Sequence, residues 1–216
     1  MEEFKKTFMT YFEANNKDMC VELTIKSLHK NAITIPDLYE KVLRPALYSI
    51  DDCVDKDNGC IWKEHVKTSI IKTVIESIYP FVIKLKKHVE PLNIKVIFVC
   101  PEKEYHEIGL RMMSDFFNLN GYDTIFIGTN SPRDQIITAI LFSNPKYIAI
   151  SVTDYYLLFE AQKMIQKIKS TYDKNIIVIV GGLAFKHNLD SVSIIGGDIY
   201  LETYEDVVSL AKEDLK

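Results

Sequence analysis

The chain has 216 residues, enough for one or two domains, and 47% of them are hydrophobic, so a sizeable buried core is possible. The formal net charge of −4 argues against a dedicated nucleic-acid-binding protein, which usually has a basic face. No apolar run approaches the roughly 18 residues that a membrane span needs, and the N-terminus is polar, so we expect a cytoplasmic protein. The four cysteines lack C-x-x-C spacing and are interpreted as buried or incidental thiols.

The first 90 residues have the periodicity of helices. Apolar side chains recur at intervals of three and four residues in four stretches, 4–12, 20–28, 36–50 and 60–89. Pro45 lies inside the third stretch and is predicted to kink it, because proline has no backbone N–H to donate. Four or five helices of this size predict a small helical bundle over residues 1–90.

Residues 91–216 have a different pattern, in which short apolar runs alternate with amphipathic stretches. The apolar runs are predicted strands at 94–100, 124–127, 147–151, 176–180 and 199–201. Strands that alternate with helices form a parallel sheet with helices on both faces. The sequence therefore predicts an α/β domain with a five-stranded, flavodoxin-like or Rossmann-like parallel sheet.

The loop after the first predicted strand holds the first candidate site. Pro101 ends the strand, and Glu104, His106 and Gly109 follow where the carboxyl edge of the sheet meets the next helix. Ligands usually bind at that edge in open α/β sheets. Imidazole is the commonest metal-donating side chain, and a carboxylate two residues away can orient it.

The segment Glu104-Tyr105-His106-Glu107-Ile108-Gly109 resembles the D-x-H-x-x-G motif of cobalamin-binding domains, with Glu in place of the usual Asp. The resemblance implies that His106 ligates cobalt from below and that Glu104 hydrogen-bonds the far side of the imidazole. It also implies cobalamin as the cofactor. The sequence leaves open whether adenosyl-, methyl- or hydroxocobalamin is held, and whether Glu104 reaches the imidazole as Asp would.

Two further predicted strand ends complete the resemblance. Ser151-Val152-Thr153 is similar to the S-x-T/L segment of that family, and Gly181-Gly182 is similar to its G-G pair. By this resemblance Ser151, Thr153, Gly181 and Gly182 belong to the cofactor-binding site. The glycines are expected to leave room for the cobalamin tail, and the Ser151 hydroxyl to bond the displaced benzimidazole nitrogen.

A Glu-His pair, Glu64-His65, stands near the start of the predicted long helix, two residues after Trp62. This segment resembles the helical cap of cobalamin-dependent photoreceptor regulators. The resemblance implies that Trp62, Glu64 and His65 face the upper side of the corrin, with His65 as a possible second cobalt ligand. That family usually has Trp ten residues before the Glu, where this chain has Val54, which weakens the case for adenosylcobalamin.

We therefore expect a cobalamin-binding sensor or regulatory module that is not an enzyme in itself. Because residue 1 begins directly in the predicted cap, we expect its output to pass through a protein partner or self-association, without direct nucleic-acid or membrane contact. The alternative is a corrinoid carrier whose partner is a methyltransferase. Two further alternatives are a haem sensor that binds its iron through His106 and a member of the cobalamin-binding family that has lost its ligand. Partner proteins would discriminate the sensor from the carrier.

Overall fold

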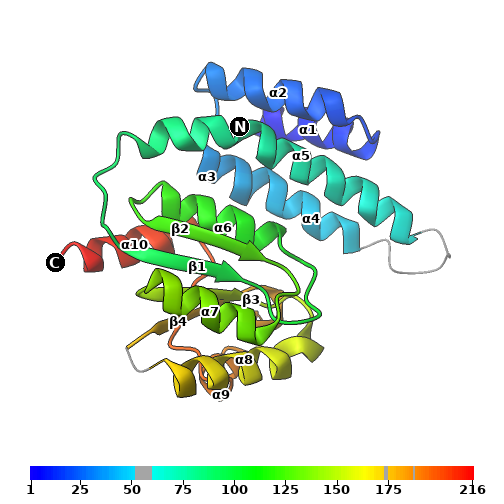
Figure 1. Cartoon of the computed structure of the whole chain (residues 1–216). Helices are drawn as coiled ribbons and strands as arrows, with labels where there is room; N and C mark the ends of the chain where they lie inside the picture. Colours follow the sequence, from blue (N-terminus) through cyan, green and yellow to red (C-terminus); the bar gives the residue numbers. More distant parts are fainter. Residues whose placement is uncertain (52–59, 173–174, 187) are drawn as a thin grey trace. The chain divides into compact units, whose positions relative to one another are not determined.

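The computed structural model describes residues 1–51, 60–172, 175–186 and 188–216 (Figure 1). The chain divides into two compact units, Met1–Lys87 and His88–Lys216. The first unit is helical, and the second contains a five-stranded parallel sheet with helices. The predicted order, a helical region followed by a Rossmann-like α/β domain, is confirmed. Among the described residues, no helix is both long and apolar enough to cross a membrane.

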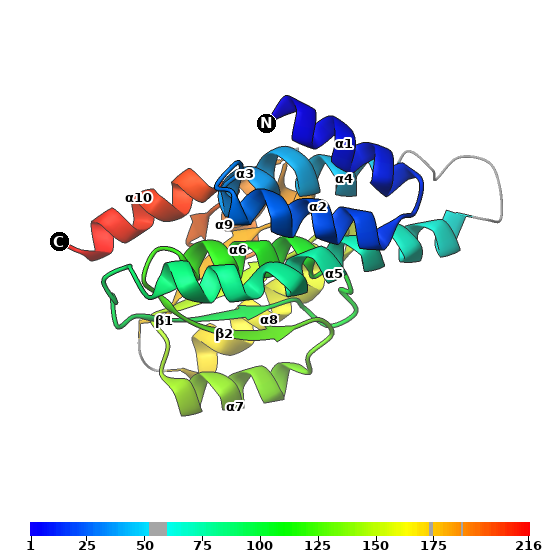
Figure 2. The ribbon, with the colours of Figure 1, turned by 90° about the horizontal axis from the view of Figure 1, so that it is seen from above.

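The helical unit has its own core. Its elements are α1 (Glu2–Glu13), α2 (Lys17–His29), α3 (Ile35–Leu38), a π-helical turn (Tyr39–Leu43), α4 (Arg44–Asp51) and α5 (Cys60–Lys86). Helix α2 packs against α5 (Figure 2). Helix α4 also packs against α5. Buried side chains from each of these helices fill the space between them, including Phe8, Phe12, Leu28, Ala46, Ile71 and Val74. The apolar spacing seen in the sequence therefore corresponds to the buried faces of the helices.

The irregularity expected at Pro45 takes the form of the π-helical turn. The Arg44 N–H donates to the carbonyl oxygen of Tyr39, five residues earlier, instead of the usual four. Pro45 has no N–H to donate, so an unbroken α-helix through this position would lack one backbone hydrogen bond. A π turn inserts one extra residue into the helical path and allows the chain to continue as α4.

The sheet has the strand order β2-β1-β3-β4-β5. Its strands are β1 (Lys95–Val99), β2 (Asp123–Gly128), β3 (Tyr147–Ser151), β4 (Ile177–Gly181) and β5 (Ile199–Tyr200). Every residue of β3 is buried, as expected for a central strand that is covered on both faces. The five strands lie at the predicted places in the sequence, with ends that differ by at most one residue.

Helices cover both faces of the sheet (Figure 1). The helices are α6 (Ile108–Asn118), α7 (Arg133–Ser143), α8 (Leu158–Thr171), α9 (Asp190–Ile194) and α10 (Tyr204–Asp214). Helices α6 and α10 contact each other, as do α7 and α8. Ile97 and Ile148 of the sheet pack with Ile136 of α7 and Ile165 of α8 in one continuous core. Helix α9 was not expected from the sequence.

The strand order brings the carboxyl ends of β1 and β3 together, next to the predicted site residues. From β1 the chain moves outward to β2, then returns across β1 to β3 and continues in the other direction. The loops after β1 and β3 therefore leave the sheet in opposite directions, and ligands in open α/β sheets bind at such a switch point. Glu104 and His106 follow β1, and Thr153 follows β3.

Candidate functional site

The carboxylate of Glu104 is the centre of the candidate site. Glu104 is fully buried in the loop between β1 and α6. Its Oε1 accepts a hydrogen bond of 2.6 Å from Nδ1 of the His106 ring and one of 2.9 Å from the His106 backbone N–H. A single carboxylate oxygen thus holds both the backbone and the imidazole of His106.

The second oxygen of Glu104 reaches across the switch point. Oε2 accepts hydrogen bonds from the backbone N–H groups of Thr153, at 2.8 Å, and Asp154, at 3.1 Å. Both donors lie in the loop after β3. The extra methylene of Glu, compared with Asp, therefore does not prevent contact with the imidazole. The sequence resemblance had identified Thr153 but not Asp154, because a backbone donor leaves no signature in residue type.

Electrostatics keep Glu104 ionised. Burial by itself would raise the pKa of its carboxyl, but the hydrogen bonds from His106, Thr153 and Asp154 stabilise the charged form and lower the pKa to about 2. An ionised carboxylate can only accept hydrogen bonds, so the proton in the 2.6 Å contact belongs to Nδ1 of His106. The lone pair of the neutral ring is consequently on Nε2, the nitrogen opposite Glu104.

The imidazole is held at an accessible position. The His106 side chain is 57% exposed, although its Glu104 partner is buried. The thiol of buried Cys100 donates to the His106 carbonyl oxygen at 3.7 Å, which adds a contact from the end of β1. A histidine with a fixed ring, a fixed tautomer and solvent access is well suited to donate Nε2 to a metal.

The Ser151 and Gly181-Gly182 motifs lie beside each other at the same edge. Ser151 is buried and pairs with Gly181 across β3 and β4. A Cβ on Gly181 would lie 2.7 Å from the Leu201 carbonyl oxygen. Gly182 has φ +106°, and a Cβ there would lie 2.3 Å from the Val152 carbonyl oxygen. Close backbone packing within the chain is therefore sufficient to require both glycines.

Gly109 is different from these two glycines. It lies in the first turn of α6, three residues after His106, and its backbone is helical. A Cβ at this position would meet nothing within 4 Å. Nothing in the described protein around it therefore requires glycine, and the open space lies close in sequence to the accessible imidazole.

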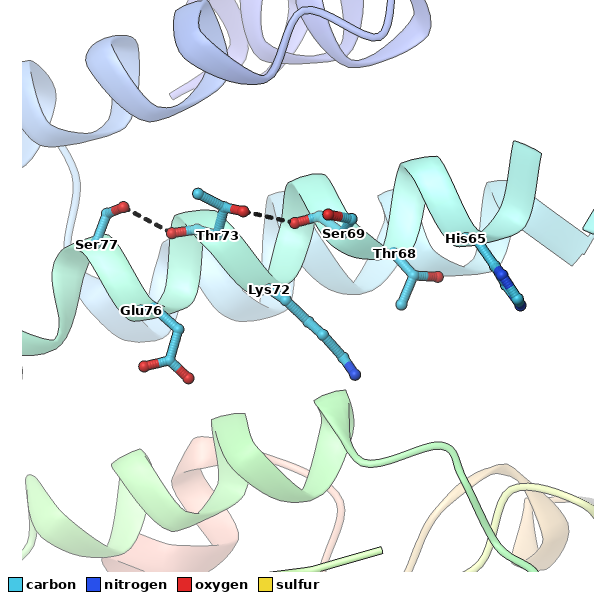
Figure 3. Close-up of a pocket in the computed structure, with 7 residues that line it drawn as sticks. All are labelled: His65, Thr68, Ser69, Lys72, Thr73, Glu76 and Ser77. Carbon is cyan, nitrogen blue, oxygen red and sulfur yellow. Dashed lines mark hydrogen bonds between the residues drawn. The ribbon is translucent and has the colours of Figure 1, made fainter. Parts of the chain in front are cut away.

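The remaining predicted site residues belong to the helical unit. Trp62, Glu64 and His65 are exposed in the first two turns of α5. Figure 3 shows that His65 begins a polar row along α5 that continues through Thr68, Ser69, Lys72, Thr73, Glu76 and Ser77. His65 and His106 belong to different units. Val54 lies outside the described residues.

The donor set indicates the kind of metal that the site could hold. Within the described ranges, no group of three His, Cys, Asp or Glu side chains is arranged to hold a metal ion. One imidazole cannot by itself enclose a bare ion, whose other positions need further protein ligands. It does suit a metal that brings most of its ligands with it in a macrocycle, as haem iron does. His106 therefore fits a cobalt that a corrin already coordinates.

An open parallel sheet with a histidine–carboxylate pair at its switch point defines a ligand-binding α/β domain. Residues 94–212 match the family described as the B12 binding domain, and the chain belongs to this family. The predicted family is thereby confirmed, and the protein is a cobalamin-binding protein.

Comparisons with individual proteins add two kinds of relative. The HTH-type transcriptional repressor CarA of Myxococcus xanthus is 20% identical over 154 residues, covering 68% of this chain and 49% of the repressor. The chain thus spans about half the length of this curated relative. The Methanosarcina barkeri monomethylamine corrinoid protein is 16% identical, with a TM-score of 0.78 over 98% of both chains.

A third comparison is with the methanol:cobalamin methyltransferase complex MtaBC of Methanosarcina barkeri. A chain of that complex is 17% identical, with a TM-score of 0.51 over 98% of this chain and 79% of its own length. At these identities, the likeness to the two solved structures establishes the shared fold alone.

Proposed function

We propose that the protein is a corrinoid carrier. It would receive a methyl group at one methyltransferase and deliver that group to a second, acceptor enzyme. The observation that carries the proposal is the structural match to the monomethylamine corrinoid protein, which extends over 98% of both chains. The similar chain in a methanol:cobalamin methyltransferase complex supports a methyltransferase as the partner. The carrier, which the sequence suggested only as the alternative, is thus better supported than the sensor.

In this proposal, the loop after β1 would hold the cobalt. Nε2 of His106 would bind the metal, while Glu104 would retain the proton on Nδ1 and make the imidazole a stronger donor. The N–H groups of Thr153 and Asp154 keep the Glu104 carboxylate in place and ionised. When bound, cobalamin would supply the metal centre that takes up and releases the methyl group.

The other motif residues would accommodate the cobalamin tail. Gly109 leaves open space at the start of α6, and the buried residue Ser151 places a hydroxyl at the end of β3. Gly181 and Gly182 allow the loops after β3 and β4 to pack closely, which would shape the wall of the tail site. Reduced cobalamin, which can take up a methyl group, and methylcobalamin are the two forms expected in a carrier cycle, and hydroxocobalamin is the oxidised form used to load the protein.

Reconstitution tests the proposal directly. The full chain is mixed with hydroxocobalamin, freed of excess ligand by gel filtration, reduced, and treated with methyl iodide in the dark. A carrier retains cobalamin through every step, and mass spectrometry of the released cofactor shows methylcobalamin. His106→Ala is expected to keep some cobalamin but to lose the His-ligated visible spectrum. Retained cobalamin that cannot be methylated, or an unchanged spectrum in His106→Ala, would contradict the proposal.

A sensor or regulatory module is the second candidate. Two observations favour it, the similarity to CarA and the exposed Glu64-His65 pair at the start of α5. In a sensor, His65 would ligate the upper face of cobalt after loss of the upper ligand, and the change would act through a partner protein or self-association. We expect no such response in a carrier. A light-dependent spectral change with adenosylcobalamin that His65→Ala abolishes would favour the sensor.

A further inference from the structure

Two tyrosines directly after the site residues of β3 are unusually exposed. Tyr155 and Tyr156 form the short 3₁₀ turn between β3 and α8, and they are 60% and 88% exposed. Their ring centroids lie 6.4 Å apart, with the ring planes at 77° to each other. Adjacent large aromatic side chains on a surface commonly mark a binding region. None of the cobalamin motifs includes these two residues.

The exposure does not result from a loose loop, because hydrogen bonds fix the backbone of the turn. Oδ1 of Asp154 accepts from the Tyr156 N–H at 2.9 Å, and the Asp154 carbonyl accepts from the Leu157 N–H at 2.9 Å. Just before the turn, the Val152 N–H donates to the Gly181 carbonyl oxygen, and the Val152 carbonyl oxygen accepts from the Ala184 N–H. The fold therefore holds both tyrosines at the surface in a defined place.

The turn is coupled to His106 through a single carboxylate. Glu104 binds the His106 ring with one oxygen and the N–H of Asp154 with the other, and Asp154 is the residue immediately before Tyr155. A planar macrocycle whose metal is bound to His106 is far wider than the imidazole. Its rim would extend over loops that neighbour His106, and the loop after β3, which Glu104 links to His106, is one of these.

We propose that Tyr155 and Tyr156 are positioning residues that support the rim of the bound corrin. The inference rests on the proposed binding of cobalamin through His106. Tyrosine combines an apolar ring with a polar hydroxyl, which matches a rim that carries both methyl and amide groups. The rings would cover the methyl groups, and the hydroxyls would hydrogen-bond the amides. Their main effect would be to slow release of the cofactor.

The test compares release of hydroxocobalamin from the full chain and three variants. The double variant Tyr155→Ala/Tyr156→Ala removes both rings, and Tyr155→Phe/Tyr156→Phe removes only the hydroxyls. Phe142→Ala is the matched control, because Phe142 is a 93% exposed aromatic residue on α7, outside the candidate site. Release is followed by gel filtration after dilution, and the visible circular dichroism of the bound corrin reports its placement.

We expect the double alanine variant to keep a His-ligated spectrum but to release cobalamin roughly tenfold faster, which corresponds to about 1.4 kcal/mol for the loss of two aromatic contacts. Its visible circular dichroism should change, and the phenylalanine variant should restore much of both properties. Phe142→Ala should match the wild type. Wild-type release and circular dichroism in the double alanine variant would overturn the inference. If only capture of a methyltransferase were lost, the tyrosines would instead contact the partner.

The result separates this inference from the proposed function. Failure of the wild-type chain to retain cobalamin, or to show a His-ligated spectrum, would contradict the role of His106 itself. Retention with a normal spectrum and unaltered release in the double alanine variant would contradict only the role of the tyrosines. Thermal unfolding of the apo forms checks that all variants are folded, which is expected because the replaced side chains are exposed.

Discussion

Glu104 uses its two carboxylate oxygens to accept four hydrogen bonds from three residues. The amide of Glu104→Gln has only one acceptor oxygen, so it must leave either His106 or the Thr153–Asp154 pair facing an NH₂ group. An unsatisfied buried donor costs roughly 1–3 kcal/mol. We expect Glu104→Gln to lower the free energy of unfolding of the apo protein by about 3 kcal/mol, measured by urea denaturation.

The same variant should also weaken cobalamin binding, because a misplaced His106 is a poorer ligand. Loss of a residue that orients a metal ligand typically costs about 10–100-fold in affinity, and spectral titration with hydroxocobalamin would measure it. Glu102→Gln is a matched control in the same loop, since its partly exposed carboxylate accepts hydrogen bonds from the backbone N–H and the guanidinium of Arg133. We expect a small effect there. Equal affinities for Glu104→Gln and the wild type would show that Glu104 does not act through His106.

At the scale of single residues, the sequence predicted the acid–histidine pair from its spacing and its place after a strand. It could not predict that Glu104 also binds the backbone of Thr153 and Asp154, because every residue type carries that N–H group. From the sequence, Gly181 and Gly182 were assigned one role, to leave room for the cobalamin tail. The structure shows that close backbone packing requires them in any case.

At the scale of elements, the first turn of α6 offers a test of the cobalamin tail site. Glycine inside a helix costs roughly 0.5–1 kcal/mol relative to alanine. Among the described residues, no atom outside the local helix backbone lies within 4 Å of a Cβ at Gly109. Gly109→Ala should therefore raise the unfolding free energy of the apo protein by up to about 1 kcal/mol. If the tail lies against this turn, the added methyl should nevertheless weaken cobalamin binding roughly tenfold or more.

Gly182→Ala is the contrasting variant for this experiment. Its backbone has φ +106°, and the new Cβ would collide with the Val152 backbone, so we expect a loss of several kcal/mol, about 3 or more, in apo stability. A stabilised Gly109→Ala protein that binds cobalamin as tightly as the wild type would remove Gly109 from the site. Urea denaturation and spectral titration give the two quantities independently.

Helix α10 is anchored by a buried carboxylate near its end. Asp214 accepts hydrogen bonds from the hydroxyls of Tyr122, at 2.6 Å, and Tyr147, at 2.9 Å, and it also pairs with Lys146. Burial, followed by hydrogen bonding to Asp214, raises the pKa of both tyrosines above the ordinary value of 10.0. The folded protein therefore keeps these protons at a pH where the unfolded chain loses them.

This difference in proton binding determines whether the free energy of unfolding rises or falls with pH. The free energy of unfolding should fall as pH rises above about 10, because the folded state then binds more protons than the unfolded state. Tyr122→Phe should lower stability at pH 7 by about 1 kcal/mol and make the alkaline decline shallower. Tyr172→Phe removes a hydroxyl bonded to the neutral amide of Asn144 and serves as the control. An identical alkaline decline in Tyr122→Phe and the wild type would contradict the assignment.

The sequence predicted elements best where periodicity was strong. All five strands and the long helix α5 were predicted close to their observed bounds, because buried strands and helical faces impose regular apolar spacing. Helix α9 was missed because its five residues are too short to show a period. The π turn before α4 was expected only as a kink at Pro45, since sequence does not show how a helix accommodates the missing N–H.

At the scale of the whole molecule, the carrier and the sensor differ in how the helical unit responds to the cofactor. Each unit has its own buried core, so hydrogen exchange can report on each separately. Bound cobalamin stabilises what it contacts by mass action, about 2.7 kcal/mol at a ligand concentration 100 times the dissociation constant. We therefore expect hydroxocobalamin to slow exchange around residues 101–107 and 152–154 in either case.

The segment around His65 distinguishes the two functions. In a carrier, the upper face of the cobalt must remain available to partner enzymes, so exchange at residues 61–65 of the loaded protein should be the same in the wild type and His65→Ala, before and after illumination. In a sensor, ligation by His65 would slow exchange in this segment after illumination, and His65→Ala would abolish the change. His88→Ala, which replaces an exposed histidine two residues after the end of α5, is the matched control. Slowed hydrogen exchange at residues 61–65 that depends on both light and His65 would contradict the carrier function and support a sensor or regulatory function.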